Sequence, residues 1–406
     1  MRPDGPGPAE LPLTFEDETP TPAPVSSDRL RAWFVLLDAA LPRPKLDRLL
    51  AEYGAPEAIL GATDADLQRV ANLRDDALRR LRETQGDRAR IRAQEEAFAQ
   101  SAMRLLEPGD DEFPHSLRQI AQPPPALFVR GQLLPEDRLA IALVGPRAAT
   151  AYAQQTAKTL ARDLSPIFTI VSGCALGIDS AAHQAALDAG GRTLGVAGCG
   201  LEQDYPQGNG PLRDRIAAEC ALVSAYPPLT KPLRHHFPAR NHLIAGLSSA
   251  VVVVEASEKS GALVTARAAL DEGREVFAVP GDVSRANSRG SNQLLRDGAL
   301  VCTCALDVVQ DLELYLTREL ADLKRQREAA APLAPPPADD APPPGLSPAE
   351  ARVLSTIRHS EQPYDALVAS LTADATLSLG QLATALLTLE LKGLVKQAPG
   401  KVYRPT

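Results

Sequence analysis

The sequence is poor in the features on which several large classes of protein depend. Its 406 residues include five cysteines, and aromatic residues make up 4% of the chain. Five scattered cysteines do not build a disulfide framework. Cys302 and Cys304 form an isolated pair without two further ligands, which indicates buried structural thiols and no metal site. No apolar run approaches the roughly 18 to 20 residues that cross a bilayer, and the N-terminus lacks a signal pattern. The sequence therefore predicts a cytoplasmic protein without membrane contact.

Two common nucleotide-binding motifs are also absent. No G-x-G-x-x-G follows a strand-like segment, and Val253 stands where a P-loop would need its first glycine ahead of Lys259 and Ser260. The sequence therefore lacks the motifs that usually indicate binding of NAD or hydrolysis of ATP by a P-loop protein. Asp179 and His183 lie four residues apart, but no nucleophile or third ligand accompanies them. A helix-capping carboxylate and a packed histidine are favoured there. We expect no catalysis and no cofactor.

Acidic residues exceed basic ones, and the formal net charge is −8. Taken alone, this charge argues against a nucleic-acid partner. The acids are unevenly spread: residues 1–25 carry five acids and one base, and residues 319–346 carry five acids and three bases. The rest of the chain therefore has a net charge of only −2. Because binding responds to the field within about 8 to 10 Å in salt, any contact with a polyanion must be focal.

The pattern along the chain predicts three folded units. Residues 1–25 are rich in proline and acid and predict a disordered tail. Residues 26–105 predict a small all-helical domain of the SAM or helix-hairpin-helix kind. Residues 106–318 contain short apolar runs that alternate with helical stretches, which is typical of a doubly wound, mostly parallel α/β sheet. Residues 319–345 predict a helix end and a linker rich in proline and alanine, and residues 346–406 a third unit.

The third unit has the outline of a winged helix. Two short helical patterns precede a segment in which Leu379, Leu382, Leu386 and Leu389 are spaced for one buried face, and a two-stranded ribbon follows. Many such domains bind duplex DNA. Here six bases stand against five acids, so a contact with DNA and a contact with protein are equally favoured.

Several strands of the α/β unit end in turns that contain glycine. These turns occupy residues 144–150, 171–183, 197–206 and 258–270. Glycine lets a backbone approach a ligand, and a helix that follows directs free N–H groups and a partial positive charge at it. Since ligands of doubly wound sheets bind at the carboxyl ends of the strands, these turns predict a site for phosphate.

Cationic and aromatic residues are expected at the same rim. Arg147 follows the first strand, and Lys259 lies beyond a later one, just before Ser260 and Gly261, which can cap the next helix. Arginine and lysine suit phosphate oxygens. Together with the turns, they favour a polyanion as ligand.

The segment HHFPARN, residues 235–241, adds an aromatic ring. Phe237 can stack an unpaired base, and Arg240 and Asn241 can contact the backbone beside it, so the segment predicts half of a clamp for single-stranded nucleic acid. An alternative stays open with even weight. Phe237 can instead belong to the core, with Arg240 paired to an internal carboxylate such as Glu255.

A series of motifs is more specific. In order, the chain contains FPHSLRQIAQPPPALFVRG, ALVGPRAATAY, IVSGCALGIDSAAHQAAL, LGVAGCGLEQDYP, FPARNHLIAGLS, SGALVTARAALDEGR, VFAVPG and GSNQLLRDGA. From about Glu112 to Ala299 this series resembles the DNA-processing protein A family. The helical and winged-helix units match the three-part layout of that family more loosely.

The resemblance implies an extended Rossmann-like core that homodimerises, binds single-stranded DNA and helps to load the RecA recombinase onto it during natural transformation. A single-strand-binding protein is a further expected partner, and no catalysis is needed for this role. Combined with the strand ends, the resemblance gives a set of expected nucleic-acid-binding residues. They are Gly145, Arg147, Ser172, Gly173, Phe237, Arg240, Asn241, Lys259, Ser260, Gly261 and Thr265.

The chain departs from the family pattern at four positions. Pro146 replaces a serine that could bind phosphate, and Leu176 stands where the family has an arginine. His242 replaces the second arginine of the F-x-x-R-N-R segment, which makes one of two cations titratable, and Ala225 replaces a glutamate. These changes affect the strength of the DNA contact rather than the fold.

Two other functions are compatible with parts of the sequence. Similar Rossmann-like folds include nucleoside-monophosphate phosphoribohydrolases, but the P-G-G-x-G-T-x-x-E signature of those enzymes is missing. In the second alternative, the winged helix recognises duplex DNA and the central unit binds a small effector.

Overall fold

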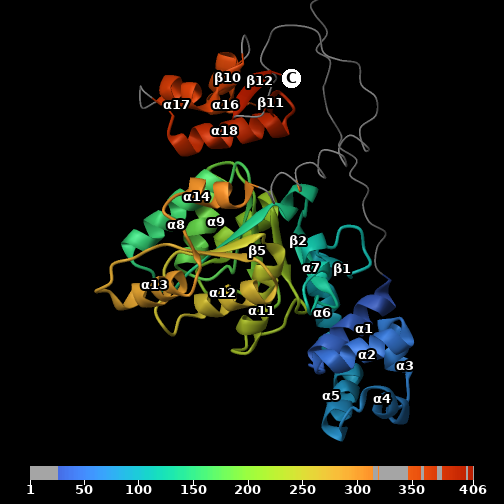
Figure 1. Cartoon of the computed structure of the whole chain (residues 1–406). Coiled ribbons are helices and arrows are strands. Elements are labelled where there is room, and N and C mark those ends of the chain that lie inside the picture. Colours follow the sequence, from blue (N-terminus) through green and yellow to red (C-terminus); the bar gives the residue numbers. More distant parts are fainter. Residues whose placement is uncertain are drawn as a thin grey trace, which may run out of the picture.

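The computed structural model describes residues 26–313, 319, 346–357, 361–372, 377–398 and 401–405. The expected acidic tail, residues 1–25, lies outside the described residues, and so does all of the expected linker except Glu319. The described parts form a group of N-terminal helices, a central sheet between helices and a small C-terminal unit (Figure 1). In these ranges, no helix is long and apolar enough to cross a membrane.

The N-terminal unit consists of short helices with clear local start and stop signals. Ser26 and Thr63 accept backbone N–H groups as N-caps, and Gly54 ends a helix in the left-handed region at φ 71°. Leucines at helical spacing on several of these helices, Leu46 and Leu49 among them, form one buried cluster. The helices are α1 (Ser27–Asp38), α2 (Arg43–Tyr53), α3 (Pro56–Gly61), α4 (Asp64–Ala71), α5 (Asp75–Gly86) and α6 (Arg88–Gln100).

The central sheet has the strand order β1-β2-β6-β5-β4-β3-β7-β8-β9. The pairs β1–β2 and β2–β6 are antiparallel, and the other neighbours are parallel. The chain moves outward from β3 in one direction as far as β6 and then returns to the other side of β3 with β7. This confirms the doubly wound, mostly parallel sheet. The strands are β1 (Arg104–Leu106), β2 (Leu127–Gly131), β3 (Ala140–Val144), β4 (Thr169–Ser172), β5 (Thr193–Ala197), β6 (Ala221–Ser224), β7 (Ala250–Val253), β8 (Glu275–Ala278) and β9 (Leu300–Val301).

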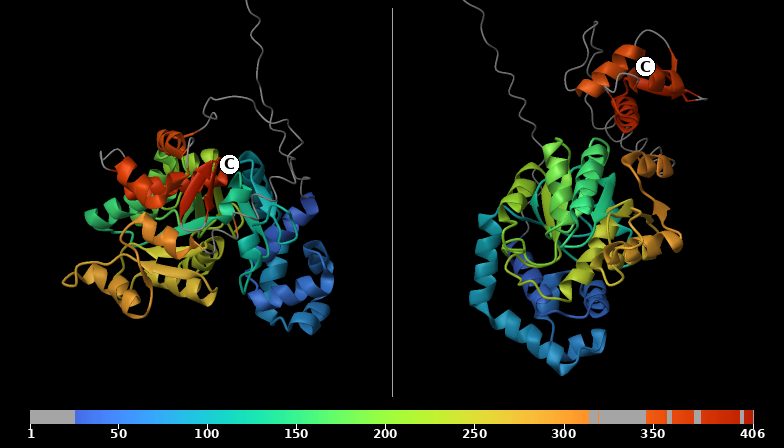
Figure 2. Two further views of the ribbon diagram at one scale, coloured as in Figure 1. Left: turned by 45° about the horizontal axis from the view of Figure 1, so that its top comes forward. Right: turned by 90° about the vertical axis from the view of Figure 1, so that its left-hand side faces the viewer.

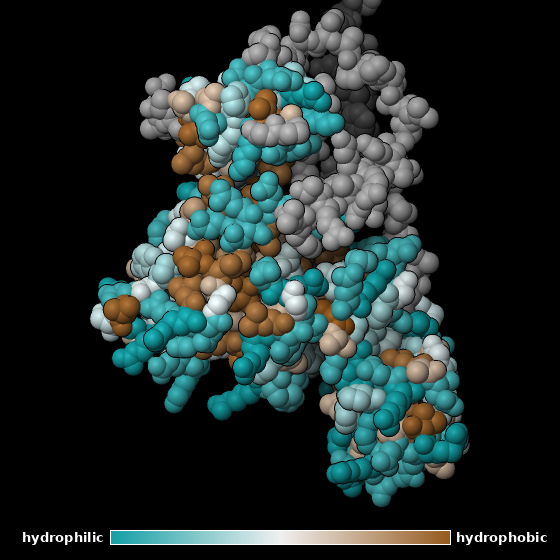
Figure 3. Space-filling view, viewed as in Figure 1, coloured by the Kyte–Doolittle hydropathy of each residue, from teal (hydrophilic) through white to brown (hydrophobic). Residues whose placement is uncertain are grey.

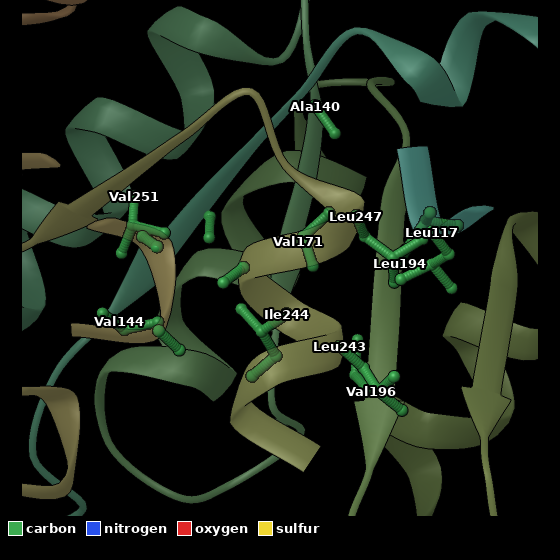
Figure 4. Packing of buried hydrophobic residues seen from close by; sticks show 14 of the residues in the cluster. Leu117, Ala140, Val144, Val171, Leu194, Val196, Leu243, Ile244, Leu247 and Val251 are labelled. Carbon is green, nitrogen blue, oxygen red and sulfur yellow. The ribbon is translucent and has the colours of Figure 1, made fainter. Parts of the chain in front are cut away.

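Helices cover both faces of this sheet (Figures 1 and 2). Successive residues of β3 point to opposite faces. Ala142 belongs to a buried cluster with residues of α7, α11 and α12, and Leu143 belongs to another with residues of α8, α9 and α14. Figure 4 shows Ile244 and Leu247 of α11 among strand residues of the cluster that contains Ala142. The helices are α7 (His115–Arg118), α8 (Ala151–Leu164), α9 (Ile178–Asp188), α10 (Gly210–Glu219), α11 (His236–Leu247), α12 (Gly261–Asp271), α13 (Arg289–Arg296) and α14 (Ala305–Asp311).

The N-terminal unit is fixed to the antiparallel edge of the sheet. The indole Nε1 of Trp33 donates to Oε1 of Glu107 at 2.9 Å, and the rings of Phe34 and Phe128 stack with centroids 6.0 Å apart. On α6, buried Gln94 accepts a hydrogen bond from the backbone N–H of Leu229 at 2.8 Å. The helical unit therefore supports the loop that leads into α11.

The C-terminal unit has the expected winged-helix content. Ser378 and Gln381 form a capping box at the start of α18, and Leu382, Leu386 and Leu389 are buried in the cluster of this unit. Leu387 on the same helix packs against the cluster beneath α8. The surface around this contact is partly hydrophobic (Figure 3). The elements are α16 (Pro348–Ile357), α17 (Tyr364–Thr372), α18 (Leu379–Leu391), β10 (Gln362–Pro363), β11 (Val395–Ala398) and β12 (Val402–Pro405).

His183 has the packed position expected for it, whereas Asp179 does not cap α9 as expected, because Gly177 is the N-cap residue and no described side chain caps this helix. The carboxylate of Asp179 accepts the backbone N–H groups of Gly173 and Ala175 in the turn before α9, and His183 is completely buried, with Nδ1 2.7 Å from Oγ1 of Thr193. The expectation of two buried thiols at Cys302 and Cys304 is half wrong. Cys302 is buried, but Cys304 is exposed because it is the N-cap residue of α14.

Burial of His183 predicts acid-sensitive stability. Burial lowers the pKa of His183 to about 3, whereas an unfolded chain binds this proton near pH 6.5. The contribution to stability is therefore complete above pH 6.5 and is lost as the pH falls toward 3. We expect urea unfolding to show about 2 kcal/mol less stability at pH 5 than at pH 7 from this group. The pH dependence should be flatter in His183→Gln, and an equal dependence in both proteins would contradict the assignment.

Candidate functional site

The glycine-bearing turns predict a site at the carboxyl ends of the parallel strands, and these ends are the candidate site. The turns after β3, β4 and β5 and the first turn of α11 enclose a cavity of about 10 Å³, which has room for about one water molecule. Most of its lining comes from segments that are far apart in the sequence. The lining residues are Arg147, Gly173, Cys174, Ala175, Ala197, Gly198, Cys199, Tyr205, Pro206, Phe237 and Arg240.

Phe237 lies at the mouth of this cavity and is only partly buried. Its ring centroid is 5.5 Å from that of Tyr205, and the planes are tilted by 43°. Gly198 passes behind the ring, where a Cβ atom would come within 2.9 Å of it. The structure thus places Phe237 at the rim of the site, accessible from outside, rather than wholly within the core.

Arg147 is exposed and lies against both rings. The guanidinium carbon is 5.2 Å from the centroid of Phe237 and 5.7 Å from that of Tyr205, and Nη1 donates to Oη of Tyr205 at 2.9 Å. The contact between cation and ring is electrostatically favourable. It leaves the other donors of the guanidinium available to an anion at the surface.

Arg240 is buried, with 5% of its surface exposed. Its Nη1 donates to the carbonyls of Gly173 and Val196, and its guanidinium carbon lies 5.9 Å from the centroid of Phe237. Burial lowers the pKa of Arg240, and the negative charge of Asp179 opposes that effect. This placement argues against the expected phosphate contact and for a structural role, because the side chain is buried and Nη1 already serves two interior carbonyls.

Glu255, the carboxylate that the sequence offered as an internal partner for Arg240, binds the start of α8 instead. Its carboxylate accepts the backbone N–H and the hydroxyl of Thr150 at 3.0 and 2.9 Å. Asp179 places a carboxylate in the first turn of α9, where it accepts N–H groups of the preceding turn. Internal anions therefore already neutralise the positive ends of these two helices.

The start of α12 is different, because its first turn contains no acidic residue. Ser260 is the N-cap residue, and exposed Lys259 precedes it without a hydrogen bond or ion pair to any other described residue. Nδ2 of Asn241 donates to the carbonyl of Gly261 at 3.4 Å, which brings α11 beside this helix end. An anion bound here would meet a helix N-terminus, a lysine and an amide.

Other residues expected at the site are interior residues. Ser172 is fully buried and donates to the carbonyl of Leu143, and Thr265 is 2% exposed. A side chain at Gly145 would overlap Ile178. The small size of these residues permits close packing behind the rim, and burial argues against a direct contact of Ser172 or Thr265 with a ligand.

Sequence reasoning missed Tyr205 as a site residue. It lies in a turn whose glycines indicate a site, and an aromatic residue after a strand end is the signal that could have found it. It also missed Lys231 and Arg234, which are exposed in the loop just before α11. The two bases in the short segment KPLRHH could have indicated this extension of positive charge.

Fold and site together define a Rossmann-like α/β protein in which exposed Arg147 and the rings of Tyr205 and Phe237 lie together at the carboxyl ends of the strands. The family model for DNA recombination-mediator protein A matches residues 104–313, and that for the DprA winged helix domain matches residues 334–401. The chain therefore belongs to the DNA recombination-mediator protein A family.

Individual relatives agree with this assignment. The DNA processing protein DprA of Streptococcus pneumoniae is 41% identical over 50% of this chain and 72% of its own length. Protein Smf of Synechocystis sp. is 35% identical over 76% of this chain and 82% of its own length. The X-ray structure of the S. pneumoniae protein superposes with a TM-score of 0.61 at 32% identity, over 71% of this chain and 98% of that chain.

Proposed function

We propose that this chain binds single-stranded DNA in recombination, at the rim formed by Arg147, Tyr205, Phe237 and the start of α12. The observation that carries the proposal is the contact of exposed Arg147 with the two rings of Tyr205 and Phe237. The start of α12, whose first turn has no acidic residue, is linked to the helix of Phe237 through Asn241. A ring can stack an unpaired base, and the cation and helix end can hold the phosphates on either side. A base inside a duplex would not reach the ring.

The cavity at this rim favours binding over catalysis. A volume of about 10 Å³ has no room for a nucleotide, whereas pockets for small ligands usually measure about 300 to 1,000 Å³. Burial raises the pKa of the Cys174 thiol, which lines the cavity, to about 12, so this group is not a nucleophile at neutral pH. The site therefore supports a surface for a strand better than a phosphoribohydrolase.

Family membership and the resemblance in the sequence support the proposal of a finer role. We propose that the protein acts in the cytoplasm as a homodimer, protects the strand and loads the RecA recombinase onto it during natural transformation. A single-strand-binding protein is a further proposed partner. Loading requires release of the strand, and backbone contacts at a surface rim suit a reversible complex.

Lys259→Ala tests the proposed site. We expect weaker binding to single-stranded oligonucleotides of every sequence and a slope of log K against log salt that is less negative by about 0.7, because one phosphate contact is lost. Fluorescence anisotropy across a salt series measures both quantities. Lys158→Ala, which removes an exposed lysine from the body of α8, is the matched control and should leave both unchanged. If Lys259→Ala also behaves as the wild type, the start of α12 is not part of the interface.

A further inference from the structure

The turn between β5 and α10 presents Tyr205 to the site. The hydroxyl of Tyr205 accepts a hydrogen bond from Arg147 at 2.9 Å, and its ring lies against Phe237. These three side chains come from three different segments: the turn after β3, the turn after β5 and the first turn of α11. Their contact is therefore a product of the tertiary fold.

The turn that carries Tyr205 is held by a buried arginine. Arg213 on α10 donates to the backbone carbonyls of Leu201, Gln203 and Tyr205, and 5% of its surface is exposed. Burial of a guanidinium is costly unless its donors are satisfied. Nη1 and Nη2 donate only to main-chain carbonyls of this turn, while Nε has no partner among the described residues. The guanidinium therefore fixes the shape of the turn.

A second set of hydrogen bonds ties the same turn to the end of β4. Nδ2 of Asn209 donates to the carbonyl of Cys174 at 2.9 Å, and the hydroxyl of Ser180 lies 3.2 Å from Oδ1 of Asn209. Asn209 is buried. The position of Tyr205 is thus fixed from both sides, whereas Arg147 is an exposed side chain without another hydrogen bond among the described residues.

We propose that Tyr205 is a positioning residue, which holds the guanidinium of Arg147 in the orientation that meets a phosphate of the bound strand. This inference rests on the proposed function. An exposed arginine loses side-chain freedom when it binds, and a residue that restricts it beforehand lowers that cost. The hydroxyl uses one donor of the guanidinium fork and leaves others for the phosphate.

A double-mutant cycle tests the proposal in the full-length protein. Affinity for a labelled oligothymidylate is measured across a salt series for wild type, Tyr205→Phe, Arg147→Ala and the double variant. Tyr205→Phe keeps the ring and removes only the acceptor, so we expect about two- to tenfold weaker binding with an unchanged salt slope and melting temperature. Arg147→Ala should make the slope less negative by about 0.7. In the Arg147→Ala background, Tyr205→Phe should have no further effect.

The outcomes separate the two proposals. If Arg147→Ala weakens binding but Tyr205→Phe binds as the wild type, the proposed function stands and the role of Tyr205 falls. Equal weakening by Tyr205→Phe in both backgrounds also overturns it, because the hydroxyl would then act independently of Arg147. If the wild-type protein does not bind the oligonucleotide, or if Arg147→Ala binds equally well, the proposed site itself is wrong and the inference fails with it.

Discussion

Replacement of Arg240 by alanine should lower the free energy of unfolding by about 3 to 5 kcal/mol, the cost typical of breaking a buried charge interaction by removing one partner. The carbonyls of Gly173 and Val196 would lose their donor. Asp179 would lose the cation that favours its ionised form, while burial continues to raise the pKa of its carboxyl group. The cavity left by the guanidinium adds to the cost.

Urea unfolding at pH 7 measures this effect, with Arg147→Ala as the matched arginine control. Arg147 is exposed, so its loss should change stability by no more than about 0.5 kcal/mol. In DNA binding we expect the reverse: Arg147→Ala should change the salt slope, and Arg240→Ala should not. If Arg240→Ala is as stable as the wild type and its salt slope is less negative by about 0.7, Arg240 turns outward and binds phosphate.

The parallel core of the sheet, β3 to β8, could be predicted because each of these strands is a short apolar run in the sequence. The run LAIALVG became β3, and SSAVVVVEA became β7, since strands covered on both faces must be apolar throughout. The direction of the chain then fixes which turns share an edge. This is why Arg147, Phe237 and Lys259 could be assigned to one rim before any contact was known.

The sequence leaves Arg240 open between a phosphate contact and an internal position, because the segment HHFPARN alone does not show which face of a helix the residue occupies. The segment contains the first turn of α11, and the buried residues of this helix recur at helical spacing. Arg240 occupies one of these inward positions, between buried His236 and Leu243. An arginine on an inward face predicts burial, but residue type suggested the surface.

Tyr205 could not be assigned to the site from the sequence for a different reason. Its neighbours in the fold, Arg147 and Phe237, are 58 and 32 residues away in the chain. The turn that carries it is shaped by Arg213, whose acceptors are backbone carbonyls and leave no trace in residue type. Contacts of this kind depend on tertiary structure alone. The local sequence can indicate a turn and an aromatic residue, but it cannot show that Tyr205 contacts Arg147 and Phe237.

Phe237→Ala should weaken binding to single-stranded DNA by about 1 to 3 kcal/mol, which corresponds to about 5- to 150-fold in affinity. The ring is partly exposed beside Arg147, so its loss removes a surface for one base while all phosphate contacts remain. The salt slope should therefore stay as in the wild type. Phe237→Leu keeps apolar bulk against Gly198 without an aromatic face, and it should bind about as weakly as the alanine variant.

The affinity of the same variants for a strand without bases tests the stacking contact directly. An abasic oligonucleotide keeps the phosphates and offers nothing to stack, so wild type and Phe237→Ala should bind it with equal affinity. Melting temperatures of all variants show whether a loss of binding reflects unfolding. If Phe237→Ala lowers affinity for the abasic strand as much as for oligothymidylate, the ring supports the shape of the rim and does not stack a base. Because both strands carry the same charge, the difference between them isolates the base contact from the electrostatic attraction of the rim.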